Sequence, residues 1–173
     1  MTNSRDEKQA GFADSSATTL NVDVLAERDL ASSARPSVCV IEDDDAIRQT
    51  VRMLLEDEGY QVIEAADGLS GYRLLRTAPV PLIAVVDHKL PRMDGCDLLE
   101  LAAQDEELRA RHAFIFVTAS PRRAEEDCGE SIEELGAPLV AKPFDIEQLL
   151  EPVAEAARRL SAQALDVREK PTM

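Results

Sequence analysis

The residue types best suited to chemistry stand directly after short apolar runs. They are two neighbouring acids, a third acid, a threonine and a lysine, namely Glu42 and Asp43, Asp87, Thr118, and Lys142. Crowded carboxylates repel one another, so at neutral pH such a group needs a cation or raised pKa values. Mg²⁺ takes one or two carboxylates with water and a phosphate oxygen, and a lysine ammonium pairs with a carboxylate or a phosphoryl group. At such a site a carboxylate can attack a phosphorus centre and form an aspartyl-phosphate.

The apolar runs indicate the strands that would bring these side chains together. Leu82–Val86 has five apolar residues without alternation, which is typical of a strand covered on both faces of a parallel sheet. Val38–Ile41 and Ala113–Thr118 have the same character. Parallel strands end at one edge of the sheet, where open α/β sheets bind their ligands. We therefore expect Asp87 to lie among the other polar strand endings, whereas Asp45 is expected to cap the following helix.

Strands and helices alternate five times along the chain. The expected strands are 38–41, 60–64, 82–86, 113–118 and 138–144, and helical spacing of apolar residues follows each of them. This order predicts an α/β fold, a doubly wound five-stranded parallel sheet with helices on both faces.

Three segments are expected to be irregular. Asp105–Arg111 reads as an acidic linker. Pro121–Leu135 contains Gly129 and many acids, so its helix should be broken or loosely packed. Pro152 lies inside the last helical pattern, which should bend or restart there.

The length of 173 residues suits one ordinary domain with tails. Met1–Pro36 is rich in Ser, Thr, Ala, Asp and Glu and is expected to be a mostly disordered arm, with a docking segment for a partner as the alternative. The domain is expected to span 37–160, and 161–173 to form a polar tail.

Composition excludes several classes of partner. The net charge of −15 disfavours nucleic acid, which needs a basic face, and aromatic residues are only 3% of the chain, too few for base stacking. No stretch approaches the ~20 apolar residues of a membrane-spanning helix, and no secretory signal is visible in residues 1–30. We therefore expect a cytoplasmic protein with no membrane partner.

Cysteines and histidines give weaker signals. Cys39, Cys96 and Cys128 are odd in number and lack C-x-x-C spacing, so they are expected to be buried free thiols in a reducing compartment. His88 adjoins Asp87 but should point away from the pocket, because successive residues leave a strand on opposite sides. His112 carries no functional signal.

Four ordered motifs resemble those of the receiver domain of bacterial response regulators, the module of chemotaxis-type single-domain regulators. The motifs are Val40–Asp44, Val86–Asp87 with Pro91–Gly95, Val117–Ala119, and Ala141–Phe144. The resemblance covers about Ser37 to Leu160. It implies the flavodoxin-like strand order 2-1-3-4-5.

Site roles follow from the resemblance position by position. It implies that Asp87 is the phosphoacceptor and that Asp43 is a direct Mg²⁺ ligand. Glu42 would act through water or more weakly, and Lys89 would offer its backbone carbonyl to the metal.

The third and fourth motifs add phosphoryl-binding groups. Thr118 and Lys142 would bind the phosphoryl group, and the Lys142–Pro143 bond is expected to be cis. Leu139 departs from the family, which usually has a Tyr or Phe there whose ring turns inward on activation. Lys89 also departs from it, since a shorter polar residue is common there, and its ammonium is a candidate to reach the site.

The function implied is that of a two-component or phosphorelay receiver. A histidine kinase or phosphotransfer protein would phosphorylate Asp87 with Mg²⁺, and the signal would leave by contact with a downstream protein that the sequence does not name. Such a module is not an enzyme beyond its own phosphorylation and dephosphorylation, and a homodimer is among the states left open.

Two other functions are weighed against this one. A receiver-like scaffold would keep the fold without phosphorylation, consistent with Leu139. A Mg²⁺-dependent phosphatase of the haloacid-dehalogenase type wants a second acid two residues after the nucleophile, and Lys89 stands there instead. No phosphate-binding glycine loop occurs, which disfavours nucleotide binding.

Overall fold

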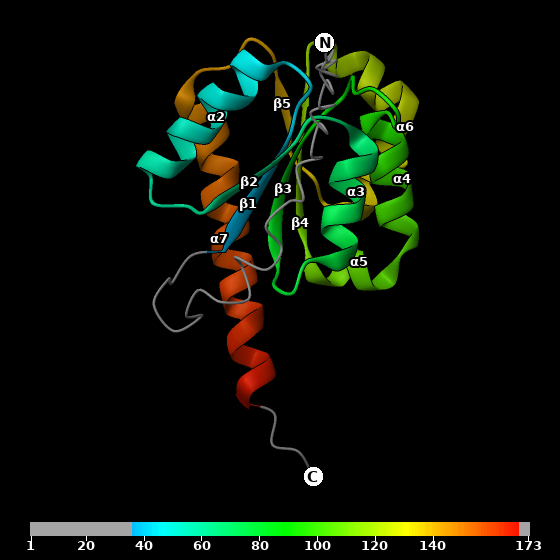
Figure 1. The fold of residues 1–173 in the computed structure, drawn as a ribbon. Coiled ribbons are helices and arrows are strands. Elements are labelled where there is room, and N and C mark those ends of the chain that lie inside the picture. The colour runs from blue at the N-terminus through cyan, green and yellow to red at the C-terminus, as the bar shows by residue number, and fades with distance from the viewer. Residues whose placement is uncertain (1–35, 170–173) are drawn as a thin grey trace, which may run out of the picture.

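Five parallel strands form the central sheet of this computed structural model, which describes residues 36–169 (Figure 1). In chain order the strands are β1 (Ser37–Ile41), β2 (Val62–Ala65), β3 (Leu82–Asp87), β4 (Ala113–Thr118) and β5 (Leu139–Ala141). Their spatial order is β2-β1-β3-β4-β5, and every neighbouring pair is parallel. This confirms the predicted doubly wound sheet and its strand order. The arm before Pro36 and the last four residues lie outside the described part.

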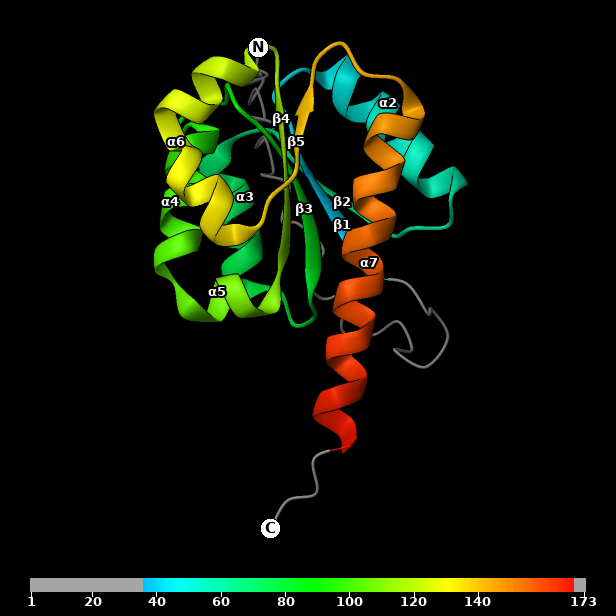
Figure 2. The same cartoon turned by 180° about the vertical axis from the view of Figure 1, so that it is seen from behind.

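Helices cover both faces of the sheet (Figures 1 and 2). One face carries α2 (Asp45–Asp57) and α7 (Ile146–Glu169). The other carries α3 (Gly68–Thr77), α4 (Gly95–Gln104), α5 (Glu106–Arg111) and α6 (Pro121–Leu135). The lower part of α7 projects past the amino ends of the strands.

Alternating strand residues supply two separate apolar layers. Val86 and Phe116 face the layer formed with α3, α4 and α6, whereas Val85 and Ile115 face the layer formed with α2 and α7. Every residue of β3 and β4 is buried, because these strands have neighbours on both sides and helices on both faces. Uninterrupted apolar runs in the sequence are therefore the signature of central strands here.

Helix starts follow local side-chain chemistry. Asp44, not Asp45, caps α2: its Oδ1 accepts hydrogen bonds from the backbone N–H groups of Ala46 and Ile47, both at 2.9 Å. The prediction for Asp45 was wrong by one residue, because Asp44 keeps an extended backbone while Asp45 is already helical. Asp45 instead pairs with Arg48 in the first turn.

The structure differs in how it agrees with the three segments that were predicted to be irregular. The expected linker after Gln104 contains α5, because Asp105 caps it through the N–H groups of Glu107 and Leu108. Leu108 is buried and anchors that short helix. The predicted break in α6 is confirmed, since Cys128 has non-helical backbone angles (φ −145°, ψ 29°).

The last helix continues through its proline without the restart that was one of the two predicted outcomes. Pro152 lies inside α7, and the helix neither ends nor restarts there. It also runs on to Glu169, so most of the expected polar tail 161–173 is helical. A proline removes one backbone donor, and the apolar contacts of Leu149, Val153 and Leu160 with the sheet compensate for that loss.

Candidate functional site

Three carboxylates meet at the carboxyl edge of the sheet. Oxygen atoms of Glu42, Asp43 and Asp87 all lie within 4.8 Å of one another. They meet because β1 and β3 are neighbours whose last paired residues are Ile41 and Val86, so both strands end at the same level. Glu42 and Asp87 are buried, with 6% and 7% of their surface exposed, whereas Asp43 is open to solvent. The predicted convergence of these acids is observed.

Lys142 brings a positive charge into this acidic cluster. Its Nζ lies 2.6 Å from Oε2 of Glu42 and 2.7 Å from Oδ1 of Asp87. Lys142 follows β5, and its backbone N–H donates to the carbonyl of Thr118 at 2.7 Å, which anchors the start of its side chain beside β4. The ammonium therefore bridges the two buried acids.

The pKa shifts in this cluster have opposing causes. Burial raises the pKa of Glu42, the charge of Asp87 raises it further, and the hydrogen bond and charge of Lys142 act against both. Burial alone would lower the pKa of Lys142, but its bonds to Asp87 and Glu42 outweigh burial and raise it. Lys142 is therefore held as a cation, while Glu42 is less acidic than usual because its oxygens have lost water.

The loop after β3 fixes the second oxygen of Asp87. The backbone N–H of Lys89 donates to Oδ2 of Asp87 at 3.2 Å. Gly95 permits the loop to fold this closely, because a Cβ atom there would lie 2.2 Å from the carbonyl oxygen of Asp87. The Lys89 ammonium does not enter the cluster: it pairs with Asp94 Oδ2 at 3.0 Å and its side chain is 64% exposed.

Thr118 contacts a residue that the sequence did not connect with it. Its Oγ1 lies 3.0 Å from Nδ1 of His88 and accepts a hydrogen bond from the backbone N–H of Ser120 at 3.0 Å. His88 is buried, with its ring tilted against Phe116 at a centroid distance of 5.4 Å. His88 was predicted to point away from the pocket, yet its Nδ1 contacts Thr118, a residue predicted to be part of the site.

Comparison with known proteins identifies the family. The model of the response regulator receiver domain matches residues 38–154. The chain belongs to this family. The receiver also resembles curated proteins: it is 33% identical over 118 residues to the sporulation initiation phosphotransferase F of Bacillus subtilis, covering 67% of this chain and 89% of that protein.

Other relatives are longer. The receiver is 33% identical over 122 residues to the transcriptional regulatory protein CseB of Streptomyces coelicolor, covering 70% of this chain and 49% of CseB. It is 31% identical over 124 residues to the DNA-binding dual master transcriptional regulator RpaA of Synechocystis, covering 72% and 50%. The chain thus spans about half the length of these regulators. Because RpaA binds DNA, the predicted absence of a nucleic-acid partner stays a prediction.

Solved structures agree with the fold. A CheY-like response regulator receiver domain protein from Methanospirillum hungatei is 29% identical, with a TM-score of 0.64 and coverage of 74% of this chain and 98% of that one. The receiver domain of the Francisella response regulator 1452 gives 26% identity, a TM-score of 0.62 and coverage of 72% and 98%. Receivers of this family are regulators in two-component systems, working with histidine kinases or phosphotransferases, and their acidic pockets typically bind Mg²⁺. As the family resemblance implied, the Lys142–Pro143 bond of this receiver is cis.

Two of the three cysteines are not free thiols. Cys96 and Cys128 form a disulfide that joins α4 to α6, with their Cα atoms 5.5 Å apart. The prediction of free thiols was wrong for this pair, because their sequence separation of 32 hides that the two helices pack side by side. It was right for Cys39, which is free and buried in β1, where burial raises its pKa to about 12.

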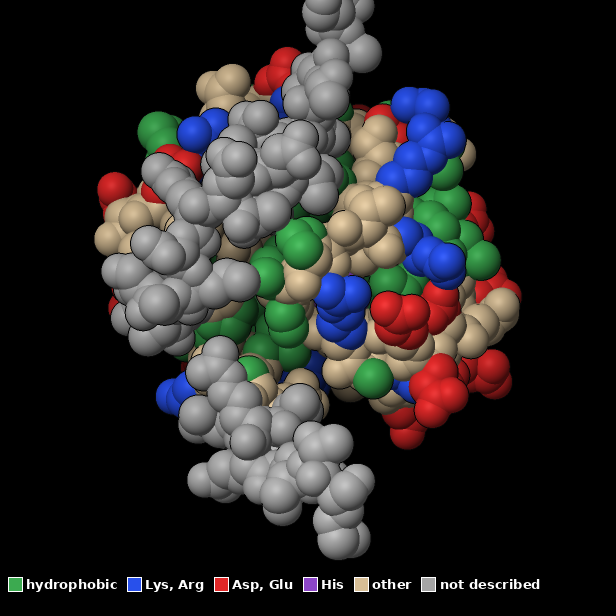
Figure 3. All heavy atoms as spheres, turned by 60° about the horizontal axis from the view of Figure 1, so that its bottom comes forward, with side chains coloured by type: hydrophobic (Ala, Val, Ile, Leu, Met, Phe, Trp, Pro, Cys, Tyr) green, Lys and Arg blue, Asp and Glu red, His purple; other side chains and the backbone are tan. Residues whose placement is uncertain are grey.

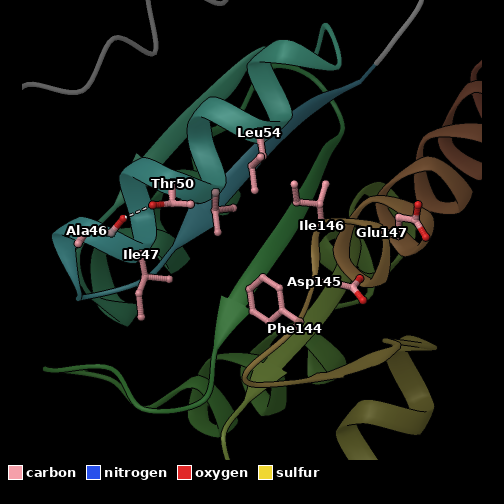
Figure 4. Close-up of a pocket in the computed structure, with 9 residues that line it drawn as sticks. Ala46, Ile47, Thr50, Leu54, Phe144, Asp145, Ile146 and Glu147 are labelled. Atoms are coloured by element: carbon pink, nitrogen blue, oxygen red, sulfur yellow. Dashed lines mark hydrogen bonds between the residues drawn. The ribbon is translucent and has the colours of Figure 1, made fainter.

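A groove lies next to the acidic cluster in sequence and space. It has a volume of about 720 Å³ and lies between α2 and the start of α7. Figure 4 shows Ile47 and Leu54 of α2 facing Phe144 and Ile146 across it. Ile47 lies four residues after Asp43, and Phe144 two residues after Lys142, so the groove is lined by segments that continue from the acidic site.

None of the helices within residues 36–169 combines the length and apolar character needed to cross a bilayer.

Proposed function

We propose that this receiver accepts a phosphoryl group on Asp87 from a histidine kinase or phosphotransfer protein and passes the signal on by protein contact. The observation that supports this most strongly is the arrangement of three converging carboxylates with the Lys142 ammonium between two of them. A buried acid cluster of this kind has no role in packing, and it lies where parallel sheets bind ligands.

Asp87 is the proposed nucleophile. One of its oxygens attacks phosphorus, a P–O bond forms, and the bond from phosphorus to the donor breaks with its electron pair leaving on the donor. The attacking group is already oriented, because Oδ1 is held by Lys142 and Oδ2 by the N–H of Lys89. Holding a nucleophile in place lowers the entropic part of the barrier, which is most of what a protein contributes to phosphoryl transfer.

The donor set fits Mg²⁺. Carboxylate oxygens of Glu42, Asp43 and Asp87 are the hard ligands that this ion prefers, and the exposed Asp43 leaves room for the waters that it keeps. We propose that Asp43 and Asp87 bind it directly, that Glu42 acts through water, and that the Lys89 carbonyl completes the set. When bound, the ion would neutralise charge on the transferred phosphoryl oxygens. One ammonium against three carboxylates leaves the cluster negative, which favours such a cation.

Lys142 and Thr118 are the residues proposed to bind the phosphoryl group. Transfer converts the Asp87 carboxylate into an acyl phosphate, so Lys142 would exchange its bond to Asp87 for one to a phosphoryl oxygen. Thr118 would donate its hydroxyl hydrogen to another phosphoryl oxygen. Phosphate thus favours one packing of these loops, and the signal is a shift in population.

The groove between α2 and α7 is the proposed contact surface for the phosphodonor. It presents apolar side chains beside the acceptor, as a docking site for an amphipathic helix needs. Its rim carries the acids Asp145 and Glu147, so we expect basic residues around the donor's apolar face.

A scaffold that functions without phosphorylation is the second candidate, and one observation favours it. Leu139 stands at the usual aromatic position of the family and packs, half-buried, against the apolar layer of α3, α4 and α6. No ring is present there to turn inward when Asp87 is phosphorylated.

Phosphorylation is tested with Mg²⁺ and acetyl phosphate, followed by intact-mass measurement. Wild type should gain about 80 Da, the mass of one phosphoryl group, and the adduct should be acid-stable and base-labile as an acyl phosphate is. Asp87→Asn should gain none, whereas Asp45→Asn, an exposed acid of the α2 first turn, should label like wild type. Equal labelling of wild type and Asp87→Asn would move the acceptor elsewhere, and no labelling of either would favour the scaffold.

A further inference from the structure

His88 ends in a buried nitrogen without a partner. Its side chain is 3% exposed, and among the described residues Nε2 is the one buried side-chain nitrogen or oxygen with no hydrogen bond. Two carboxylate oxygens lie near it, Oδ1 of Asp94 at 4.0 Å and Oδ2 of Asp127 at 3.9 Å, both too distant for a hydrogen bond. A buried polar atom in this position loses water and gains nothing in exchange, so its retention needs an explanation.

A sulfur atom and a carboxylate oxygen lie near that nitrogen. Nε2 of His88, a carboxylate oxygen of Asp94 and Sγ of Cys96 lie within 4.8 Å of one another. Cys128 contributes a second sulfur, since it is bonded to Cys96. Two cysteines, one histidine and one carboxylate are a donor set that Zn²⁺ takes in four-coordinate sites, whereas Mg²⁺ avoids sulfur.

We propose that the reduced receiver binds one Zn²⁺ ion through His88, Asp94, Cys96 and Cys128, and that the disulfide is the metal-free alternative of the same site. This site is separate from the acidic cluster of Glu42, Asp43 and Asp87, which offers only oxygen. For one pair the required movement is small: two ligands at about 2.1 Å from a tetrahedral ion lie roughly 3.4 Å apart, compared with 4.0 Å between Nε2 and Oδ1 of Asp94. The group within 4.8 Å consists of His88, Asp94 and Cys96, so Cys128 has to approach it.

Local backbone structure permits those movements. Cys128 lies at the non-helical residue of α6, and a side chain at the following Gly129 would meet no atom within 4 Å. Cys96 is the second residue of α4, held by the hydrogen bond from its N–H to Oδ1 of Asp94 at 3.1 Å. One sulfur therefore lies on a fixed helix start and the other at a helix break that can adjust.

Thr118 fixes the ring of His88 in the way that outer groups fix metal-binding histidines. With Nε2 on the metal, Nδ1 carries the proton and donates to Oγ1 of Thr118, 3.0 Å away. Oγ1 also accepts the N–H of Ser120, so its own hydrogen becomes free to donate elsewhere. On the proposed function, which this step alone presupposes, the zinc form leaves Thr118 ready to donate to a phosphoryl oxygen.

Reduction of the Cys96–Cys128 disulfide needs two electrons, which a phosphine supplies. A water-soluble trialkylphosphine takes up oxygen from water, becomes a phosphine oxide and delivers two electrons to the disulfide, and the two protons of that water end on the two sulfurs. Binding of Zn²⁺ then releases these two protons as the thiols become thiolates.

The test uses the full chain, reduced with the phosphine, freed of it under anaerobic conditions, and titrated with Co²⁺ in excess Mg²⁺. Reduced wild type should bind one Co²⁺, with a thiolate-to-cobalt charge-transfer band and the intense visible bands of a tetrahedral ion. Added Zn²⁺ should displace it. The oxidised protein should show neither band, and Cys39→Ala, which removes the buried thiol of β1, should behave as wild type.

Variants assign the ligands independently of phosphorylation. His88→Leu and Cys128→Ser should each weaken Zn²⁺ at least ten-fold, measured by competition with a chromophoric chelator, with circular dichroism showing that both remain folded. His88→Leu binding Zn²⁺ as tightly as wild type would overturn the proposal. So would a reduced wild type that binds Co²⁺ without the charge-transfer band, since that spectrum belongs to an all-oxygen site. Labelling of Asp87 enters neither measurement, so this proposal and the proposed function fail separately.

Discussion

The two edges of the sheet each contain a buried histidine, and the two are bonded very differently. His112, before β4 at the amino edge, uses both ring nitrogens: Nδ1 accepts from the N–H of Leu82 at 3.0 Å, and Nε2 lies 3.1 Å from the carbonyl of Leu75. These partners fix the tautomer with the proton on Nε2. His88, after β3 at the carboxyl edge, uses only Nδ1 and leaves Nε2 without a partner.

The charged side chains at the two edges of the sheet also differ. At the carboxyl edge, Glu42 and Asp87 are buried charged groups held together by Lys142. On the amino-edge face in Figure 3, Lys and Arg side chains lie beside Asp and Glu side chains in the part that is not grey. At this edge the end of α3 is joined to the start of α5 by an ion pair between Arg76 Nη1 and Asp105 Oδ2 at 2.5 Å.

Buried polar groups at the two edges have different consequences for the protein. Bonds that satisfy a buried polar group completely stabilise the fold and leave nothing for a ligand. Buried groups left unsatisfied or crowded with like charge lower stability, and they persist at the edge where the loops bind ligands. The amino edge should therefore control stability, and the carboxyl edge should control chemistry.

The largest expected effect on stability is at the amino edge. His112→Ala leaves a buried N–H and a buried carbonyl unpaired, at about 1–3 kcal/mol each, and we expect a loss of about 4 kcal/mol in the free energy of unfolding by urea titration. His112→Gln, which retains a donor and an acceptor, should recover part of it. Phosphoryl labelling per folded molecule should equal that of wild type. A His112→Ala variant as stable as wild type would show that the two bonds of His112 do not stabilise the amino edge.

A smaller effect is expected from Lys142, and it should depend on the metal. Lys142→Met leaves Glu42 and Asp87 facing each other unpaired, which should lower the free energy of unfolding by about 3 kcal/mol without divalent ions. Mg²⁺ binds the folded state of either protein, but it should stabilise the variant more because it replaces the missing charge. Urea titrations with and without Mg²⁺ measure this difference.

Lys89→Met is the matched control for that experiment. Its ammonium pairs with Asp94 at an exposed position, so its removal should change stability by less than about 1 kcal/mol. An equal gain from Mg²⁺ in wild type and Lys142→Met would contradict the proposed charge balance at the carboxyl edge.

Much of the carboxyl edge was predictable because its signals are local. Apolar runs identified the central strands, and each run ended at the residue that reaches the site, as with Asp87 and Lys142. Strand order came from the family motifs rather than from the runs, since parallel pairing is not encoded within any one segment.

What sequence reasoning missed depends on distant packing. The contact of His88 with Thr118 joins residues 30 apart, and the disulfide joins helices that meet only in the folded chain. The partners of His112 come from β3 and the end of α3, so its role could not be seen in its own segment. Sequence spacing alone does not reveal these contacts, because their partners come together only when the strands have assembled into the sheet.

The smallest predicted effect comes from pH and distinguishes the amino edge from the rest of the protein. Burial, with a contribution from the charge of Arg111, lowers the pKa of His112 to about 4, compared with 6.5 for an ordinary histidine. The unfolded chain therefore binds a proton at this residue as pH falls through 6.5, while the folded chain does not until about pH 4. Stability is lost in that window and is fully present above it.

Between pH 7.5 and 5.5 the loss from His112 alone should be about 1.3 kcal/mol. His112→Gln cannot titrate at this position, so subtracting its free energy of unfolding from that of wild type at each pH removes the carboxylates and His88 from the result. The wild-type free energy of unfolding minus that of His112→Gln should decrease steadily as pH falls. A constant value would mean that the His112 ring is not buried and hydrogen-bonded in the folded protein. The slope is a direct measure of that burial and hydrogen bonding, because protonation puts an N–H where Nδ1 now accepts the N–H of Leu82.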